Sequence, residues 1–174
     1  MTSDEIRTLY EYNCWANQQV LASALQVGDA AFAADCPVSH GSLRGLLVHA
    51  LAVEWLWRQR CQKGTSPPHF IPGERFHQVD SVRVAWVEEA RTMRRYLADL
   101  TDGLLNDTVC YTTRRGENCD YVLWQLLVHL VNHGTQHRAE AGVCLARLDH
   151  SPGDLDFVLW LERGRPTGLG VDDG

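Results

Sequence analysis

The sequence lacks the segments that would place the protein in or across a membrane. No apolar run reaches the roughly 18 residues that a membrane-spanning helix needs, and the longest one, around residues 124–131, is interrupted by Gln125 and His129. The N-terminal residues 1–5 are acidic at positions 4 and 5 and contain no apolar core of the kind found in secretory signals. We therefore expect a cytoplasmic protein that makes no contact with membranes.

Positive charge is also scarce. The chain carries 16 Lys and Arg residues against 22 Asp and Glu, which gives a formal net charge of −6. A negative protein without a basic stripe repels the phosphates of nucleic acids and of anionic lipids. Nucleic acid is therefore not an expected partner.

No pair of cysteines has the CxxC spacing, although the chain contains six cysteines. A chain of 174 residues that is 45% hydrophobic can build a core without disulfides. We therefore expect free thiols in a reducing compartment. The six are Cys14, Cys36, Cys61, Cys110, Cys119 and Cys144.

Length and composition predict a single domain over residues 1–163. The remaining residues, 164–174, contain several glycines after Arg165-Pro166, so we expect a flexible tail there.

Apolar residues recur at helical spacing in four long stretches, which are bounded by N-cap residues and glycines. A shorter stretch, Leu155 to Glu162, predicts a fifth helix that covers an open end of the bundle. The class that follows is all-α, a four-helix bundle. The first stretch begins after Ser3 and ends at Gly28-Asp29, and the second runs from Ser42 to about Gln62, with Gly64 as the stop. The third begins after Asp80 and ends before Asp102, and the fourth begins after Asp120 and runs to about Leu148.

The connections between these helices constrain the topology. Residues 63–79 form a loop much longer than antiparallel neighbours require, so they can cross the length of the bundle and leave the second and third helices parallel. This predicts an up-down-down-up bundle. Residues 108–113 are strand-like and residues 114–117 are turn-like, which predicts a small hairpin before the fourth helix.

Three histidines follow one another at helical spacing in the fourth helix: His129, His133 and His137. Neighbouring members of this series lie one turn apart on the same side, where two imidazoles can chelate one metal ion. His129 and His137 cannot share an ion, because eight residues rise about 12 Å along a helix. The spacing therefore allows two pairs, His129 with His133 or His133 with His137.

His49 is the best candidate for a ligand from another helix, because it lies among leucines on the inner face of the second helix. A single histidine in such a place is more often a core residue than a ligand. Several neutral imidazoles that meet inside a bundle, however, are hard to satisfy without a metal or buried water. Three histidines around one ion leave a coordination position open for water or substrate.

Three segments of the sequence resemble the DinB-like (damage-inducible) family of metal-dependent four-helix-bundle enzymes. They are residues 12–21 (YNCWANQQVL), residues 41–49 (GSLRGLLVH) followed by Glu54 and Trp57, and residues 132–138 (NHGTQHR). The resemblance implies a bundle with a long second connection, often dimeric. It also implies a divalent metal, nickel or zinc, held by His49, His133 and His137, with His129 as a neighbour one turn away. The sequence departs from the family after Arg138, where it reads Ala139-Glu140.

The resemblance also implies a function. A metal-dependent hydrolase or an S-transferase that uses a low-molecular-weight thiol is expected, acting on a small-molecule substrate. No carboxylate is placed as a general base, since Glu54 lies off the face of His49. A non-catalytic metal-binding stress-response protein is the alternative, and the net charge argues against a DNA-binding role. Arg138 is expected either to bind an anionic substrate group or to form a salt bridge. The remaining histidines are expected to be peripheral: His40, His69, His77 and His150.

Overall fold

Four long helices and a fifth short one make up most of the protein. The computed structural model describes residues 1–69 and 71–171. Within these residues, two short 3-10 turns (Gly73–Arg75 and Leu104–Asn106) and one hairpin complete the secondary structure. The helices are α1 (Ser3–Ala33), α2 (Leu43–Lys63), α3 (Val79–Ala98), α4 (Leu123–Ala146) and α5 (Phe157–Glu162).

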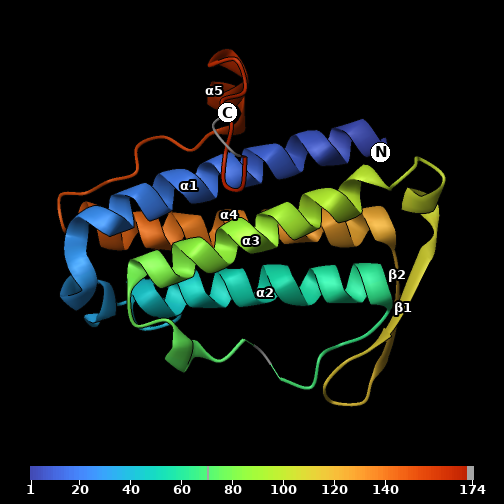
Figure 1. Ribbon diagram of the computed structural model, residues 1–174, viewed down its shortest axis with the longest axis horizontal. Helices are drawn as coiled ribbons and strands as arrows, with labels where there is room; N and C mark the ends of the chain where they lie inside the picture. The colour runs from blue at the N-terminus through green and yellow to red at the C-terminus, as the bar shows by residue number, and fades with distance from the viewer. Residues whose placement is uncertain (70, 172–174) are drawn as a thin grey trace.

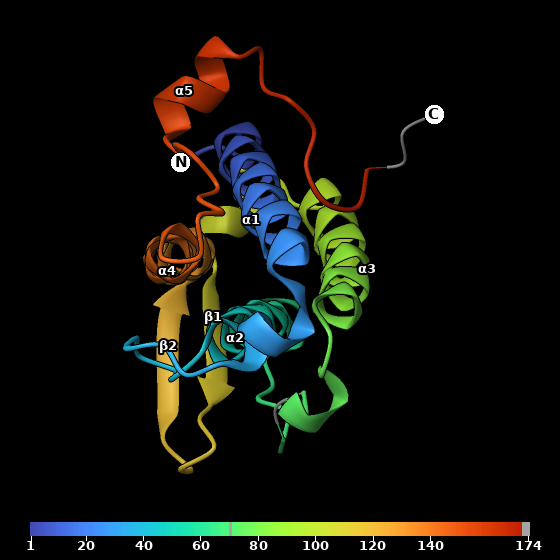
Figure 2. The same ribbon diagram turned by 90° about the vertical axis from the view of Figure 1, so that its left-hand side faces the viewer.

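The long helices form an up-down-down-up bundle, as the sequence predicts. In Figure 1, α1 and α4 run in one direction, whereas α2 and α3 run in the other. The long connection between Lys63 and Val79 returns the chain along the bundle, which makes α2 and α3 parallel. Seen almost end-on in Figure 2, the four helices enclose one core, to which all of them contribute buried apolar residues.

The predicted end signals of α2 are confirmed. The Ser42 hydroxyl accepts a hydrogen bond from the backbone N–H of Gly45, and Gly64 adopts the left-handed conformation (φ 62°) that ends many helices. The ends of α1 differ from the prediction. Thr2 rather than Ser3 is the N-cap, in a capping box with Glu5, and the helix continues beyond Gly28 to Ala33 across a kink.

The predicted hairpin is present and extends further than expected. β1 (Thr108–Thr112) pairs with β2 (Asn118–Val122) in antiparallel register, with Thr108 opposite Val122. β2 therefore occupies residues that the sequence assigns to the start of the fourth helix, and α4 begins at Leu123. Figure 1 shows the hairpin at the end of the bundle where α2 ends and α4 begins, and its strands contact these two helices.

The C-terminal segment packs on the outside of the bundle. In α5, the Trp160 ring is buried against Tyr12, with the ring centroids 6.1 Å apart. Leu169 is also buried, and its N–H donates to the carbonyl of Cys14 at 3.4 Å. The segment predicted to be a flexible tail is thus held against α1 at this point. Residues 172–174 lie outside the described residues.

Two cysteines depart from the prediction of free thiols. Cys36, in the loop between α1 and α2, forms a disulfide with Cys144 on α4, so the prediction is wrong for this pair. Cys14 and Cys61 are buried free thiols, as expected. No helix in the described ranges is long and apolar enough to cross a membrane.

Candidate metal centre

The three predicted ligands come together between α2 and α4. These two helices pack side by side, with His49 in the second turn of α2 and His133 and His137 one turn apart on α4. The ring centroids are 4.7 Å apart for His49 and His137, 5.3 Å for His49 and His133, and 4.4 Å for His133 and His137. The two helices therefore place three imidazoles in mutual contact.

The nitrogen atoms of this group indicate a place for a cation. Nε2 of His137 and Nε2 of His133 face each other at 3.1 Å. The Nδ1 atom of His137, a buried residue, has no hydrogen-bond partner among the described residues. An unsatisfied buried polar atom is unfavourable unless it binds something. Nitrogen donors that come together in this way could hold a metal ion.

His40 belongs to the same cluster, although the sequence predicts a peripheral position. Its ring stacks on that of His49 with a centroid distance of 3.8 Å and lies 5.3 Å from that of His137. One donor nitrogen each from His40, His49 and His137 lies within 4.8 Å of the others. The three residues could hold a metal ion together, so the expectation of a peripheral His40 is wrong.

Gly45 explains why the loop of His40 lies so close to α2. A Cβ atom at this position would collide with the carbonyl oxygen of His40. The bare backbone of Gly45 lets the loop close over the first turn of the helix. The sequence signal that could have revealed this contact was a glycine inside the first turn of a helix, three residues after the N-cap.

The pKa values of His49, His133 and His137 are lowered, which favours the neutral form of these three imidazoles. Burial, reinforced by the neighbouring histidines, lowers the pKa of His49 and that of His133 to about 4. Burial also lowers the pKa of His137, and Glu140 opposes this shift. Neutral imidazole is the form that binds metals, so the ligands need not lose protons when an ion enters.

His129 is a neighbour of the cluster rather than a member of it. Its side chain is exposed, with its ring 6.0 Å from that of His133 and 4.9 Å from that of Trp57. It lies one turn from His133 on α4, as the helical spacing predicts.

Arg138 is part of the core and is not available to bind a substrate anion. It is only 4% exposed, and its Nη1 donates to Oδ1 of Asn13 at 2.5 Å and to Oδ1 of Asn17 at 2.8 Å. Gly134 leaves room for this contact, because a Cβ atom at that position would lie 2.7 Å from both Nη1 of Arg138 and Oδ1 of Asn13. Of the two roles that the sequence leaves open, substrate binding and a salt bridge, the structure is nearer to the second. The partners of Arg138 are side-chain amides, however, and not a carboxylate.

Glu54 completes this buried network. Its carboxylate accepts hydrogen bonds from the hydroxyl of Tyr10 at 2.6 Å and from Nε1 of Trp86 at 3.1 Å. The Nδ2 atoms of Asn13 and Asn17 donate to it at 3.3 and 3.5 Å. Amides thus connect the Glu54 carboxylate to the Arg138 guanidinium, and the network ties together all four long helices. Glu54 is a structural residue in the core, as its place off the His49 face suggests.

The fold and the cluster define the class of protein, a four-helix bundle with a histidine group from the α1–α2 loop, α2 and α4 that could hold a metal ion. The sequence matches the DinB family over residues 1–166, and the chain belongs to this family. It is 24% identical over 163 residues to Protein DinB of Bacillus subtilis (strain 168), an alignment that covers 91% of this chain and 95% of that protein.

Proposed function

We propose that the protein is a metal-dependent enzyme whose divalent ion is held by His49, His133 and His137. The observation that carries this proposal is the meeting of three imidazoles, with Nε2 of His137 3.1 Å from Nε2 of His133 and the ring of His49 4.7 Å from that of His137. Three neutral ligands leave the full positive charge on the ion and one position open for another group. Such an ion lowers the pKa of a water or thiol bound to it and so supplies a nucleophile.

The reaction class follows from this chemistry. A nucleophile made from water supports hydrolysis, and one made from a low-molecular-weight thiol supports transfer of sulfur to an electrophile. Both need a small-molecule substrate, and nickel and zinc both suit imidazole ligands. A homodimer in the cytoplasm remains part of this proposal. Size-exclusion chromatography with light scattering tests the oligomeric state.

Metal content of the untagged protein tests the proposed ligands. We expect one equivalent of metal in the wild type and none in His133→Ala or His137→Ala, whereas His129→Ala keeps most of it. His77→Ala, which removes an exposed imidazole from the long loop, is the matched control. Loss of metal in His129→Ala but not in His137→Ala would show that the ligand pair is the other one on α4.

Turnover tests the enzymatic part of the proposal. The metal-loaded protein is assayed for conjugation of a thiol to a chlorinated aromatic compound or an epoxide, and for hydrolysis of an ester. Activity should disappear in His133→Ala and persist in His77→Ala. Stoichiometric metal without turnover of any of these substrates would contradict the enzymatic role.

A non-catalytic metal-binding protein of a stress response is the second candidate, and His40 favours it. A fourth imidazole on the ion would close the coordination sphere that catalysis needs open. His40→Ala distinguishes the two functions. In an enzyme with three ligands it retains the metal and the activity, whereas in a closed four-ligand site it weakens metal binding sharply.

A further inference from the structure

A pocket of about 540 Å³ opens between α2, α4 and the hairpin, with His129 in its lining. Its walls are mostly aromatic, with Tyr111 buried at one side and Tyr121 47% exposed. Polar side chains complete the lining. The aromatic and polar lining residues are Trp57, Arg60, Tyr111, Tyr121, Gln125 and His129.

Arg60 gives this pocket a positive charge that is not paired with any acidic group in the described part of the chain. Its guanidinium lies over the ring of Trp57, 4.6 Å from the centroid, and over that of Tyr111, 4.4 Å from the centroid. Its Nε donates to the hydroxyl of Ser66 at 3.0 Å. In the described part of the chain, no carboxylate lies within ion-pair distance of it. Burial lowers the pKa of this guanidinium, which means that its charged form is incompletely solvated.

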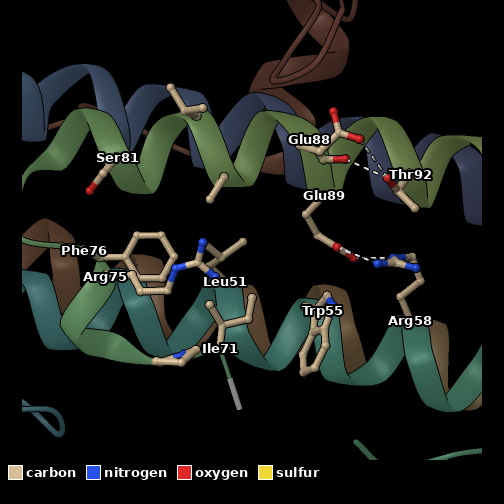
Figure 3. Close-up of a pocket in the computed structure, with 13 residues that line it drawn as sticks. Leu51, Trp55, Arg58, Ile71, Arg75, Phe76, Ser81, Glu88, Glu89 and Thr92 are labelled. Atoms are coloured by element: carbon tan, nitrogen blue, oxygen red, sulfur yellow. Dashed lines mark hydrogen bonds and ion pairs between the residues drawn. The ribbon is translucent and has the colours of Figure 1, made fainter. Parts of the chain in front are cut away.

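Two other arginines packed into this bundle, Arg58 and Arg94, have carboxylate partners. Arg58 forms two hydrogen bonds with the carboxylate of Glu89, at 2.5 and 2.8 Å, and Arg94 pairs with Glu11 at 2.7 Å. The larger cavity between α2 and α3, of about 800 Å³, contains the paired Arg58 (Figure 3). Arg60 therefore differs from these arginines, since its charge remains free to pair with a ligand.

His129 lines the pocket and is also the neighbour of the histidine cluster on α4. The ring of Trp57 contacts that of His129 at 4.9 Å, and the ring of His129 lies 6.0 Å from that of His133. A molecule in this pocket thus has one end beside Arg60 and another near a proposed metal ligand.

We propose that this pocket binds small aromatic carboxylates, with the carboxylate on Arg60 and the ring among Trp57, Tyr111 and Tyr121. A guanidinium prefers a planar, bidentate anion such as a carboxylate, and aromatic walls favour a planar apolar body. This proposal rests on the proposed function, because the pocket is taken as the substrate site of the metal-dependent enzyme. It names the substrate class as planar carboxylates and assigns Arg60 as a specificity-determining residue.

Benzoate and its neutral analogue benzamide are the probes. Two-dimensional NMR follows the indole N–H of Trp57 and the ring of His129 during titration of the full-length chain, with and without metal. We expect benzoate to bind at least 10-fold more tightly than benzamide. Arg60→Gln should remove this preference, Arg60→Lys should keep part of it, and Arg95→Gln, which changes an exposed arginine on α3, should leave it unchanged.

Tyr121→Ala provides a second test, because removal of a half-exposed ring leaves the charge and the buried residues in place. It should weaken benzoate several-fold even if Arg60→Gln disturbs the fold. Equal affinity for benzoate and benzamide, or benzoate binding that is unchanged in both Arg60→Gln and Tyr121→Ala, would overturn the inference. Binding that depends on Arg60 in a protein that takes up no metal would support the pocket and contradict the proposed function.

Discussion

Glu140 lies where the loop of His40 meets the histidines of α4. One of its carboxylate oxygens lies 3.6 Å from Nδ1 of His137, and the other accepts the backbone N–H of Ser39 at 2.8 Å. A carboxylate behind a metal-binding imidazole fixes the ring and increases its basicity. The departure from the family motif at Ala139-Glu140 therefore places an acidic group beside a proposed ligand.

Replacing this carboxylate should weaken the metal site without unfolding the protein. We expect Glu140→Gln to lower metal affinity by about 10-fold, because outer partners of metal ligands typically contribute 10- to 100-fold. The affinity is measured by competition with a chromophoric chelator, and Glu162→Gln in α5 is the control. An unchanged affinity in Glu140→Gln would show that this carboxylate serves only the loop.

Protonation of the histidines should destabilise the metal-free protein. The pKa of His49 and that of His133 are about 4 in the folded chain, because the rings are buried, and about 6.5 in an unfolded one. Between these values the unfolded chain binds more protons. The free energy of unfolding is therefore fully retained above about pH 6.5 and falls as the pH drops toward 4.

Urea unfolding of chelator-treated protein at pH 7 and pH 5 measures this effect. The midpoint should be lower at pH 5, and the difference should shrink in His133→Gln but not in His77→Gln. A pH difference that is the same in wild type and His133→Gln would exclude His133 as its source.

At the scale of the helices, the buried network around Glu54 fixes how the bundle is assembled. Helix α2 supplies the Glu54 carboxylate as the acceptor, and α1 and α3 supply donors. Helix α4 supplies the Arg138 guanidinium, which the asparagines of α1 connect to this carboxylate. Apolar packing alone allows helices to slide or rotate. A buried carboxylate with several directed donors permits one register, and that register brings His49 opposite His137.

Glu54→Ala should destabilise the protein by about 3 kcal/mol or more, because it leaves the Tyr10 hydroxyl and the Trp86 indole N–H buried without an acceptor, at about 1–3 kcal/mol each. Glu54→Gln retains an acceptor oxygen and should cost less. Urea unfolding gives both values. If alanine proved no worse than glutamine, the carboxylate would not be the acceptor that these donors need.

Local signals in the sequence predict the helices well, and long-range contacts explain what they miss. Ser42 and Gly64 cap α2 as expected, because capping depends on adjacent residues alone. Gly28 kinks α1 without ending it, since residues beyond it, including the buried Phe32, pack on the core. The length of the hairpin depends on pairing between strands, which periodicity along one strand does not report.

The candidate site divides in the same way. Helical spacing brings His133 and His137 together, and an inner helix face together with the family resemblance adds His49. His40 lies in a loop whose path depends on Gly45 and on contacts with α4, so no periodicity marks it. The pairing of Cys36 with Cys144 likewise joins residues 108 positions apart and has no local signature.

For the whole molecule, this disulfide is the covalent link between the loop of His40 and the helix of the other histidines. Cys36 precedes His40 in the loop between α1 and α2, and Cys144 follows His137 on α4. The bond therefore closes a ring of the chain that includes α2, α3 and the hairpin. It restricts the unfolded chain over most of its length.

Reduction of this bond should lower the free energy of unfolding by about 4 kcal/mol, because a cross-link across about 100 residues removes that much loop entropy from the unfolded state. Urea unfolding of the metal-free protein, with and without a phosphine reductant, measures the loss. Cys36→Ala should have the unfolding midpoint of the reduced wild type, and the reductant should not change it. Cys110→Ser, at an exposed free thiol, should have the midpoint of the oxidised wild type. If reduction leaves the unfolding midpoint of the wild type unchanged, the bond does not stabilise the protein in solution. The non-covalent contacts of the loop, such as the Ser39–Glu140 hydrogen bond and the stacking of His40 on His49, would then hold it in place.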